Sequence, residues 1–217
     1  DVLNLAGIKI YEKVDDIPLT SRSRIYTMDN LDITELRARS VADPAWYWNA
    51  VLEDLGIQFA TPHTEVLDLG RGIEHPDWFV GAELNVVDTC LRRWRDAGPD
   101  RIAVRHEAED GSTRTLTYAE LAEQVGRAAA GLGRLGIGRG DAVALYLPMI
   151  PELAVAMLAC TRIGVIHSIV FAGFSPESLA GRILDCKGKV VITSDEGVRG
   201  GKPVPLKANT DEALKKC

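Results

Sequence analysis

The sequence predicts an α/β fold, with part of a parallel sheet flanked by helices and preceded by a mostly helical and irregular extension. From Thr117 onward, helical and strand patterns alternate in the order α-β-α-β-α-β, which favours a parallel sheet with right-handed crossovers. Ala142–Leu147 has the apolar pattern of a buried strand, and Lys189–Thr193 has that of a later one. The first strand pattern follows Asp100, so we predict an extension over residues 1–99 and an α/β domain over residues 100–217.

The composition is that of an ordinary soluble globular protein, with 217 residues, a net charge of -6 and 46% hydrophobic residues. The acidic balance argues against broad nucleic-acid binding, which needs a basic face. No apolar run approaches the length of a membrane span, and no secretory signal is visible. The four cysteines lack paired spacing, so we expect free thiols and a cytoplasmic location. The chain begins at Asp1 without Met, which leaves an upstream segment open.

Two helices are expected within the extension. Asp43 is the predicted N-cap of the first, with Pro44 at its first position and Gly56 at its end. A second, short helix is predicted over Val87–Trp94 and stops before Gly98. The apolar face of the first helix is formed by Trp48, Val51, Leu52 and Leu55.

The α/β region opens with a hairpin and continues with two helices. Ile102–His106 and Thr113–Thr117 alternate like strands around an Asp-Gly turn signal. Thr117 and Glu120 form a capping box that starts a helix. A further helix runs from Pro151 to Ile163 and is apolar almost all round, so we expect it to be buried. The stripe of the first of these helices consists of Leu121, Val125, Ala128, Leu132 and Leu135.

Three other patterns are not interpreted as functional sites. Gly131, Gly133 and Gly136 match the dinucleotide fingerprint as letters, but they end a helix, so close helix packing and a C-cap are the better interpretation. Gly197–Lys202 is one residue short of a phosphate-binding P-loop and lacks its Ser or Thr. His167 lies in a strand without a nucleophile or carboxylate at useful spacing, which favours a core histidine.

Small-residue turns follow two strands that we expect to be neighbours. Phe171, Ala172 and Gly173 follow the strand Ile166–Val170, after which Ser175 opens a helix. The second turn comes after Lys189–Thr193 and consists of Arg199, Gly200, Gly201 and Lys202. Ligands of open α/β sheets lie at the carboxyl ends of strands, and backbone without side chains approaches a phosphate closely. From the residues alone, a solvated turn with two surface cations remains an alternative.

Three long segments carry a family resemblance. ALYLPMIPELAVAMLACTRIG, VIHSIVFAGFSPESLAGRILD and KVVITSDEGVRGGKPVPLKANTDEALK resemble the acetyl-CoA synthetases of the acyl-adenylate-forming, AMP-binding family. The resemblance runs from near Trp46 to the end of the chain and is densest after Thr117. It implies that residues 1–99 form the family's N-terminal extension. It also implies that residues 100–217 form a truncated start of the large adenylating domain.

The resemblance also implies an activity. These enzymes activate a carboxylic acid with ATP and magnesium as an acyl-adenylate, and the thiol of coenzyme A then displaces AMP. Acetate is the expected acid; propionate or another small acid, and a non-catalytic module that binds coenzyme A or a nucleotide, are the alternatives. The ATP-binding loop, the magnesium site and the catalytic lysine of the family are absent from this sequence. We therefore expect the chain to be inactive alone and to self-associate through its truncated sheet, with no nucleic-acid or membrane partner.

The candidate site residues follow from the resemblance. Arg199, Gly200, Gly201 and Lys202 match a turn that meets the phosphates of coenzyme A, with Arg199 acting as a planar fork and Lys202 as a point charge. Phe171, Ala172 and Gly173 match a turn that lines the same site. Phe171 packs either on the adenine or in the core. Ala172 stands where the family has glycine, and it is strained only if its φ is positive. The sequence assigns no catalytic residue and no metal ligand.

Overall fold

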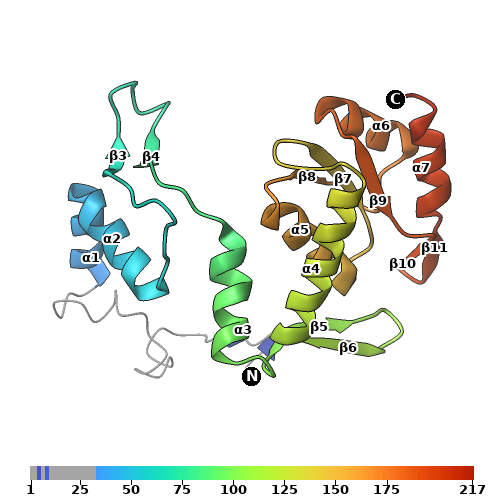
Figure 1. Cartoon of the computed structure of the whole chain (residues 1–217), viewed down its shortest axis with the longest axis horizontal. Coiled ribbons are helices and arrows are strands. Elements are labelled where there is room, and N and C mark those ends of the chain that lie inside the picture. The colour runs from blue at the N-terminus through green and yellow to red at the C-terminus, as the bar shows by residue number, and fades with distance from the viewer. Residues whose placement is uncertain (1–3, 6–7, 10–32) are drawn as a thin grey trace. The chain divides into compact units, whose positions relative to one another are not determined.

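The computed structural model describes residues 4–5, 8–9 and 33–217. The chain forms two compact units, residues 1–85 and residues 86–217 (Figure 1). The predicted boundary at 99/100 rests on the first strand pattern of the α/β region, and it stays a prediction about domain organisation.

The described part of the first unit contains two helices and two antiparallel strand pairs. As predicted, Asp43 caps the second helix by accepting from the Trp46 backbone N–H at 2.9 Å, and Gly56 ends it with φ 60°. Trp48 packs edge-to-face on Trp78, with ring centroids 5.7 Å apart. The elements are β1 (Asn4–Leu5), β2 (Ile8–Lys9), α1 (Ile33–Ala42), α2 (Pro44–Leu55), β3 (Glu65–Asp68) and β4 (Asp77–Val80).

The second unit begins with a helical segment and a hairpin. The short helix predicted over residues 87–94 runs from a π-helical turn, η5 (Asp88–Arg92), into α3 (Arg93–Ala97). The hairpin pairs β5 (Ile102–Glu107) with β6 (Thr113–Thr117) in antiparallel register, as the sequence predicts. Its turn includes Gly111, which has φ 80°.

A three-stranded parallel sheet forms the middle of this unit. It consists of β7 (Ala142–Tyr146), β8 (Ile166–Ile169) and β9 (Val190–Thr193) in the order β8-β7-β9. The parallel arrangement confirms the prediction from the alternating element order. The strands before the two candidate turns are β8 and β9. They were expected to be neighbours, but β7 lies between them.

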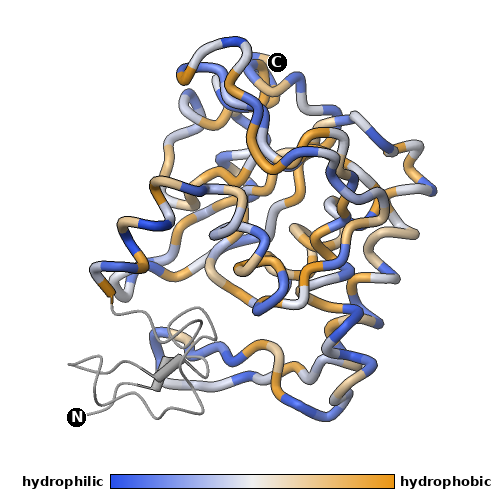
Figure 2. Tube along the Cα trace, turned by 90° about the vertical axis from the view of Figure 1, so that its left-hand side faces the viewer, coloured by the Kyte–Doolittle hydropathy of each residue, from blue (hydrophilic) through white to orange (hydrophobic). Residues whose placement is uncertain are grey.

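Both faces of the sheet are covered by helices. On one side lie α4 (Tyr118–Arg134) and α5 (Pro151–Arg162), and on the other lie α6 (Pro176–Asp185) and α7 (Leu206–Leu214) (Figure 1). Side chains alternate across β7, so that Val143 and Leu145 join the first core cluster while Ala144 and Tyr146 join the second. Figure 2 shows the hydrophobic stretches running through the interior of this unit. Complete burial of β7 is therefore what its apolar sequence predicted.

The helix start signals of this unit are confirmed. In α4, the Thr117 hydroxyl accepts from the Glu120 backbone N–H at 3.2 Å, and the Glu120 carboxylate accepts from the Thr117 N–H at 2.8 Å. Ser175 caps α6 by accepting from the Ser178 N–H at 3.3 Å. These caps satisfy backbone donors that have no partner within the helix.

Three expectations about this unit need correction. Leu135 does not continue the stripe of α4, because it lies beyond the last helical residue and is 68% exposed. Gly131 and Gly133 do not serve close packing, since a Cβ on either would meet no atom within 4 Å; only the C-terminal glycine, Gly136 with φ 76°, fulfils its expected role. His167 is half-buried rather than a core residue, because β8 is an outer strand of the sheet.

The candidate second turn is the tip of a hairpin that the sequence analysis did not predict. β10 (Gly197–Arg199) pairs with β11 (Lys202–Val204) in antiparallel register, and Gly200 and Gly201 form the two-residue loop with φ 57° and 71°. Two successive positive φ values are typical of tight hairpin loops and favour glycine at both positions.

Candidate functional site

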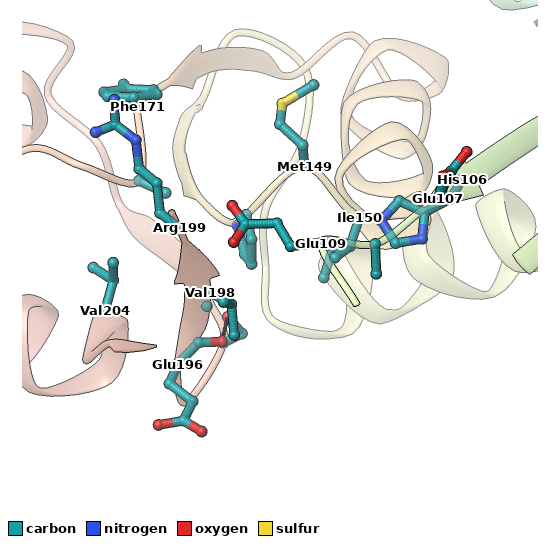
Figure 3. Close-up of a pocket in the computed structure, with 15 residues that line it drawn as sticks. His106, Glu107, Glu109, Met149, Ile150, Phe171, Glu196, Val198, Arg199 and Val204 are labelled. Carbon is teal, nitrogen blue, oxygen red and sulfur yellow. Dashed lines mark hydrogen bonds between the residues drawn. The ribbon is translucent and has the colours of Figure 1, made fainter. Parts of the chain in front are cut away.

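Phe171, Ala172 and Arg199 of the candidate turns line a cavity of about 560 Å³ at the carboxyl ends of the parallel strands, whereas Gly173, Gly200, Gly201 and Lys202 are not among its lining residues (Figure 3). This is where ligands bind in open α/β sheets. The walls come from five places in the second unit: the β5–β6 hairpin, the loop after β7, the turn after β8, the loop after β9 and the β10–β11 hairpin. The residues used below are Glu109, Met149, Phe171, Ala172 and Arg199.

Arg199 and Phe171 join the two turns. The guanidinium carbon of Arg199 lies 4.6 Å from the centroid of the Phe171 ring, within the range of a cation–π contact (Figure 3). Phe171 is 50% exposed and packs edge-to-face on Phe174, with centroids 5.7 Å apart. Phe171 is thus not a core aromatic residue, and part of its surface is open to a ligand.

Gly173 allows this contact through its lack of a side chain. A Cβ at this position would clash with Nη1 of Arg199 and would lie 2.7 Å from Cε1 of Phe171. The Gly173 backbone does not need a positive φ. Ala172 also lies outside the left-handed region, so the alanine that replaces the family's glycine is unstrained.

Tyr146 anchors the turn after β8, a role that the sequence analysis missed. Its side chain is fully buried, and its hydroxyl donates to the Phe174 carbonyl at 2.8 Å, with the Ala172 carbonyl at 3.2 Å. The side-chain amide of Asn209 in α7 donates to the same hydroxyl at 3.2 Å. A tyrosine at the end of a buried strand is a usable signal, because a buried hydroxyl requires a partner.

The backbone donors of the Gly200–Gly201 loop bind a carboxylate of the chain itself. The Gly200 N–H donates to Oε1 of Glu109 and the Gly201 N–H donates to Oε2, each at 2.8 Å. These two hydrogen bonds, and to a lesser extent the charge of Arg199, lower the pKa of Glu109. The loop N–H groups that we expected to approach a phosphate are therefore engaged by Glu109 in this structure.

The two cations of the hairpin project from one face. Arg199 and Lys202 are directly opposite each other in the β10–β11 register, which places their side chains on the same side of the hairpin. Both are exposed. Among the described residues, neither makes an ion pair with a carboxylate. The arrangement can thus bind an anion through a planar fork and a point charge.

The described residues contain no cluster of three His, Cys, Asp or Glu side chains able to hold a metal ion. Burial raises the pKa of the Cys160 thiol and that of Cys90, which disfavours the reactive thiolate at both positions. Within residues 33–217, no helix is long and apolar enough to cross a membrane. What the site offers is binding groups: cations, an aromatic face and a cavity.

Two family models match the chain. That of the AMP-binding enzymes matches residues 91–217, and that of the acetyl-coenzyme A synthetase N-terminus matches residues 33–90. Among similar proteins, the acetyl-coenzyme A synthetase of Syntrophobacter fumaroxidans is 52% identical over 191 residues, which are 87% of this chain and 29% of that protein. That of Bradyrhizobium diazoefficiens is 45% identical over 95% of this chain and 32% of its own length.

A solved structure is also similar to this chain. The acetoacetyl-CoA synthetase from Streptomyces lividans superposes with a TM-score of 0.81 at 29% identity, covering 89% of this chain and 30% of that one. The chain thus spans about a third or less of the length of these relatives. The predicted fold, that of the N-terminal part of such an enzyme, is confirmed by these matches.

Proposed function

This chain belongs to the AMP-binding enzyme family, and from that premise we propose that it supplies part of the coenzyme A site of an acetate–CoA ligase. The observation that carries the proposal is the contact between Arg199 and Phe171 at 4.6 Å, which joins two ligand-facing turns in one cavity. The names of the similar proteins support acetate as the acid.

The proposed reaction has two steps. An acetate oxygen attacks the α-phosphorus of ATP, and pyrophosphate leaves to give acetyl-AMP. The sulfur of coenzyme A then attacks the acetyl carbon, AMP leaves with the electrons of the cleaved C–O bond, and the thiol proton is released. Both steps require bound, oriented reactants, because orientation lowers the entropic part of the barrier.

The residues of this chain act on the second substrate. Arg199 and Lys202 bind the phosphates at the nucleotide end of coenzyme A, one by paired N–H groups and the other by its charge. The exposed part of Phe171 packs against the adenine ring. Gly173 keeps the space that Arg199 occupies, and Tyr146 fixes the backbone of the same turn.

Calorimetry with coenzyme A tests this assignment. We expect Arg199→Ala to weaken binding about tenfold or more, because a hydrogen bond to a charged group contributes about 1.5–3 kcal/mol. The matched control is Arg127→Ala, which removes an equal charge from an exposed i,i+4 pair with Glu123 on α4. Equal affinities of the two variants would remove Arg199 from the site.

A pyrophosphate-release assay tests the division of labour. A polypeptide of these 217 residues, supplied with acetate, ATP and magnesium, is expected to release no pyrophosphate. The reason is that the sequence contains neither the phosphate-binding loop nor the lysine that the resemblance assigns to adenylate formation. Turnover above the buffer control would contradict this expectation.

A further inference from the structure

The contact between Glu109 and the β10–β11 hairpin joins segments that are 91 residues apart in the sequence. Glu109 lies in the turn region of the β5–β6 hairpin, and its carboxylate accepts hydrogen bonds from the Gly200–Gly201 loop. Its side chain is exposed, so burial does not explain the contact.

The loop has the shape of an anion-binding nest. Successive backbone N–H groups in a turn form a concavity that binds anions, and Gly200 and Gly201, with φ 57° and 71°, form such a turn between β10 and β11. Each oxygen of Glu109 accepts one of these N–H groups at 2.8 Å. The carboxylate is thus held at two points, which fixes the loop more firmly than a single hydrogen bond would.

Fixing the loop also fixes Arg199, the residue that directly precedes it. The guanidinium of Arg199 does not pair with Glu109; it lies on the ring of Phe171 at 4.6 Å. Glu109 therefore holds the backbone and leaves the cation available. Without this contact the hairpin, with three residues in each strand, would be free to move away from Phe171.

We infer that Glu109 is a positioning residue for the phosphate-binding cation Arg199: its carboxylate clamps the Gly200–Gly201 loop and thereby sets the guanidinium over Phe171. The inference rests on the proposed coenzyme A site. It differs from a placeholder role, in which Glu109 would occupy the nest until a phosphate displaced it. The two roles predict opposite effects of removing the carboxylate.

The binding test uses 3′-phosphoadenosine 5′-diphosphate, the nucleotide end of coenzyme A, and the 217-residue chain. Removing a negative charge near the site strengthens anion binding by itself, so a charge-matched reference is needed. Glu107→Gln provides it, because Glu107 belongs to the same hairpin and makes no hydrogen bond to the loop. We expect Glu109→Gln to bind about tenfold more weakly than Glu107→Gln, as loss of preorganisation predicts.

A second measurement reports on the clamp itself. In NMR spectra, the amide protons of Gly200 and Gly201 should shift upfield as pH falls below the ordinary pKa of a glutamate, because the lowered pKa of Glu109 keeps the acceptor charged down to that range. Glu109→Gln should abolish this titration, while Glu107→Gln should retain it. Unchanged amide shifts and titration in Glu109→Gln would overturn the inference.

The outcomes separate the inference from the function on which it rests. The positioning role is overturned if Glu109→Gln binds the nucleotide as tightly as Glu107→Gln or more tightly. Tighter binding by Glu109→Gln favours the placeholder role. Failure of the wild-type chain to bind the nucleotide refutes the proposed coenzyme A site and, with it, the positioning of Arg199 for a phosphate. In that case the amide titration still decides whether Glu109 clamps the loop.

Discussion

At Gly173, the lack of a side chain decides how two turns meet. The position that a Cβ would occupy is taken by the guanidinium of Arg199 and the ring of Phe171. One residue earlier in the same turn, a small side chain is tolerated: Ala172 has an ordinary backbone conformation, and its carbonyl lies 3.2 Å from the Tyr146 hydroxyl. The site therefore depends on space at one glycine rather than on unusual φ angles in this turn.

Gly173→Ala is expected to weaken coenzyme A binding about tenfold, because the new methyl group displaces the guanidinium from Phe171. Its free energy of unfolding should change little, since the two clashing groups, the Arg199 guanidinium and the Phe171 ring, belong to exposed side chains that can shift, and the backbone needs no positive φ. Calorimetric titration and thermal unfolding measure the two effects. Gly181→Ala, at a helical position with no atom within 4 Å of the added Cβ, is the control and should bind normally.

The sequence predicted the residues that face the cavity better than those that hold them. Arg199 and Phe171 were identified through the family resemblance, whereas the residues alone left a solvated turn and a core aromatic residue as alternatives. Glu109 looked like part of an ordinary Asp-Gly turn, because its partners lie 91 residues away and only the fold brings them together. The buried hydroxyl of Tyr146 was overlooked within an apolar run.

At the level of elements, long and regular segments agreed with prediction and short ones did not. The apolar run of β7 and the capping box of α4 identify these elements without tertiary information. Hairpin β10–β11 was missed, although Gly-Gly is a two-residue hairpin signal, because strands of three residues give too little alternation to detect. The order β8-β7-β9 was also beyond local patterns, since strand order depends on where the crossover helices pack.

Gly133→Ala is expected to stabilise the protein by about 0.5–1 kcal/mol, because alanine loses less backbone entropy on forming a helix than glycine does. The position lies inside α4, and an added Cβ meets no atom within 4 Å. Chemical denaturation measures the change. A loss of stability would show that close packing at this glycine matters after all.

An ion pair ties the start of α6 to the residues after α7. Lys216 Nζ lies 2.5 Å from Oε1 of Glu177, and this hydrogen bond, followed by those from the Glu177 N–H and Ser175, lowers the pKa of Glu177 to about 2. A depressed carboxyl pKa adds stability above the pKa of the unfolded chain, and this contribution is lost as pH falls through the folded value. We therefore expect Glu177→Gln to flatten the decline in melting temperature between roughly pH 4.3 and pH 2. Parallel curves for wild type and variant would contradict this.

At the level of the whole molecule, the parallel sheet of the second unit has β8 and β9 as its outer strands. Helices cover both faces, but β8 leaves Ile166 60% exposed and Ile169 50% exposed. Parallel strands are rarely left open to water, and an unpaired outer strand promotes association. The relatives are about three times as long as this chain, as the coverage of 29% to 32% indicates, so a full-length relative contains much further chain.

We expect the 217-residue chain to self-associate through β8, with a sedimentation coefficient that rises with protein concentration. Ile166→Lys should shift the equilibrium toward the monomer, because a charge on an outer strand opposes pairing. Leu135→Lys serves as the reference, since Leu135 is 68% exposed but lies outside the sheet. Association that is equally weakened by both substitutions would argue against β8 as the contact.

The distance in sequence between Glu109 and Gly200 also sets an order of events during synthesis. At about 5–20 residues per second, 91 residues correspond to about 5–18 s of translation. The β5–β6 hairpin has local contacts and is ready to form in that interval, with its carboxylate still in water. The Gly200–Gly201 loop is thus fixed late, once both glycines have been synthesised and can bind the carboxylate of Glu109.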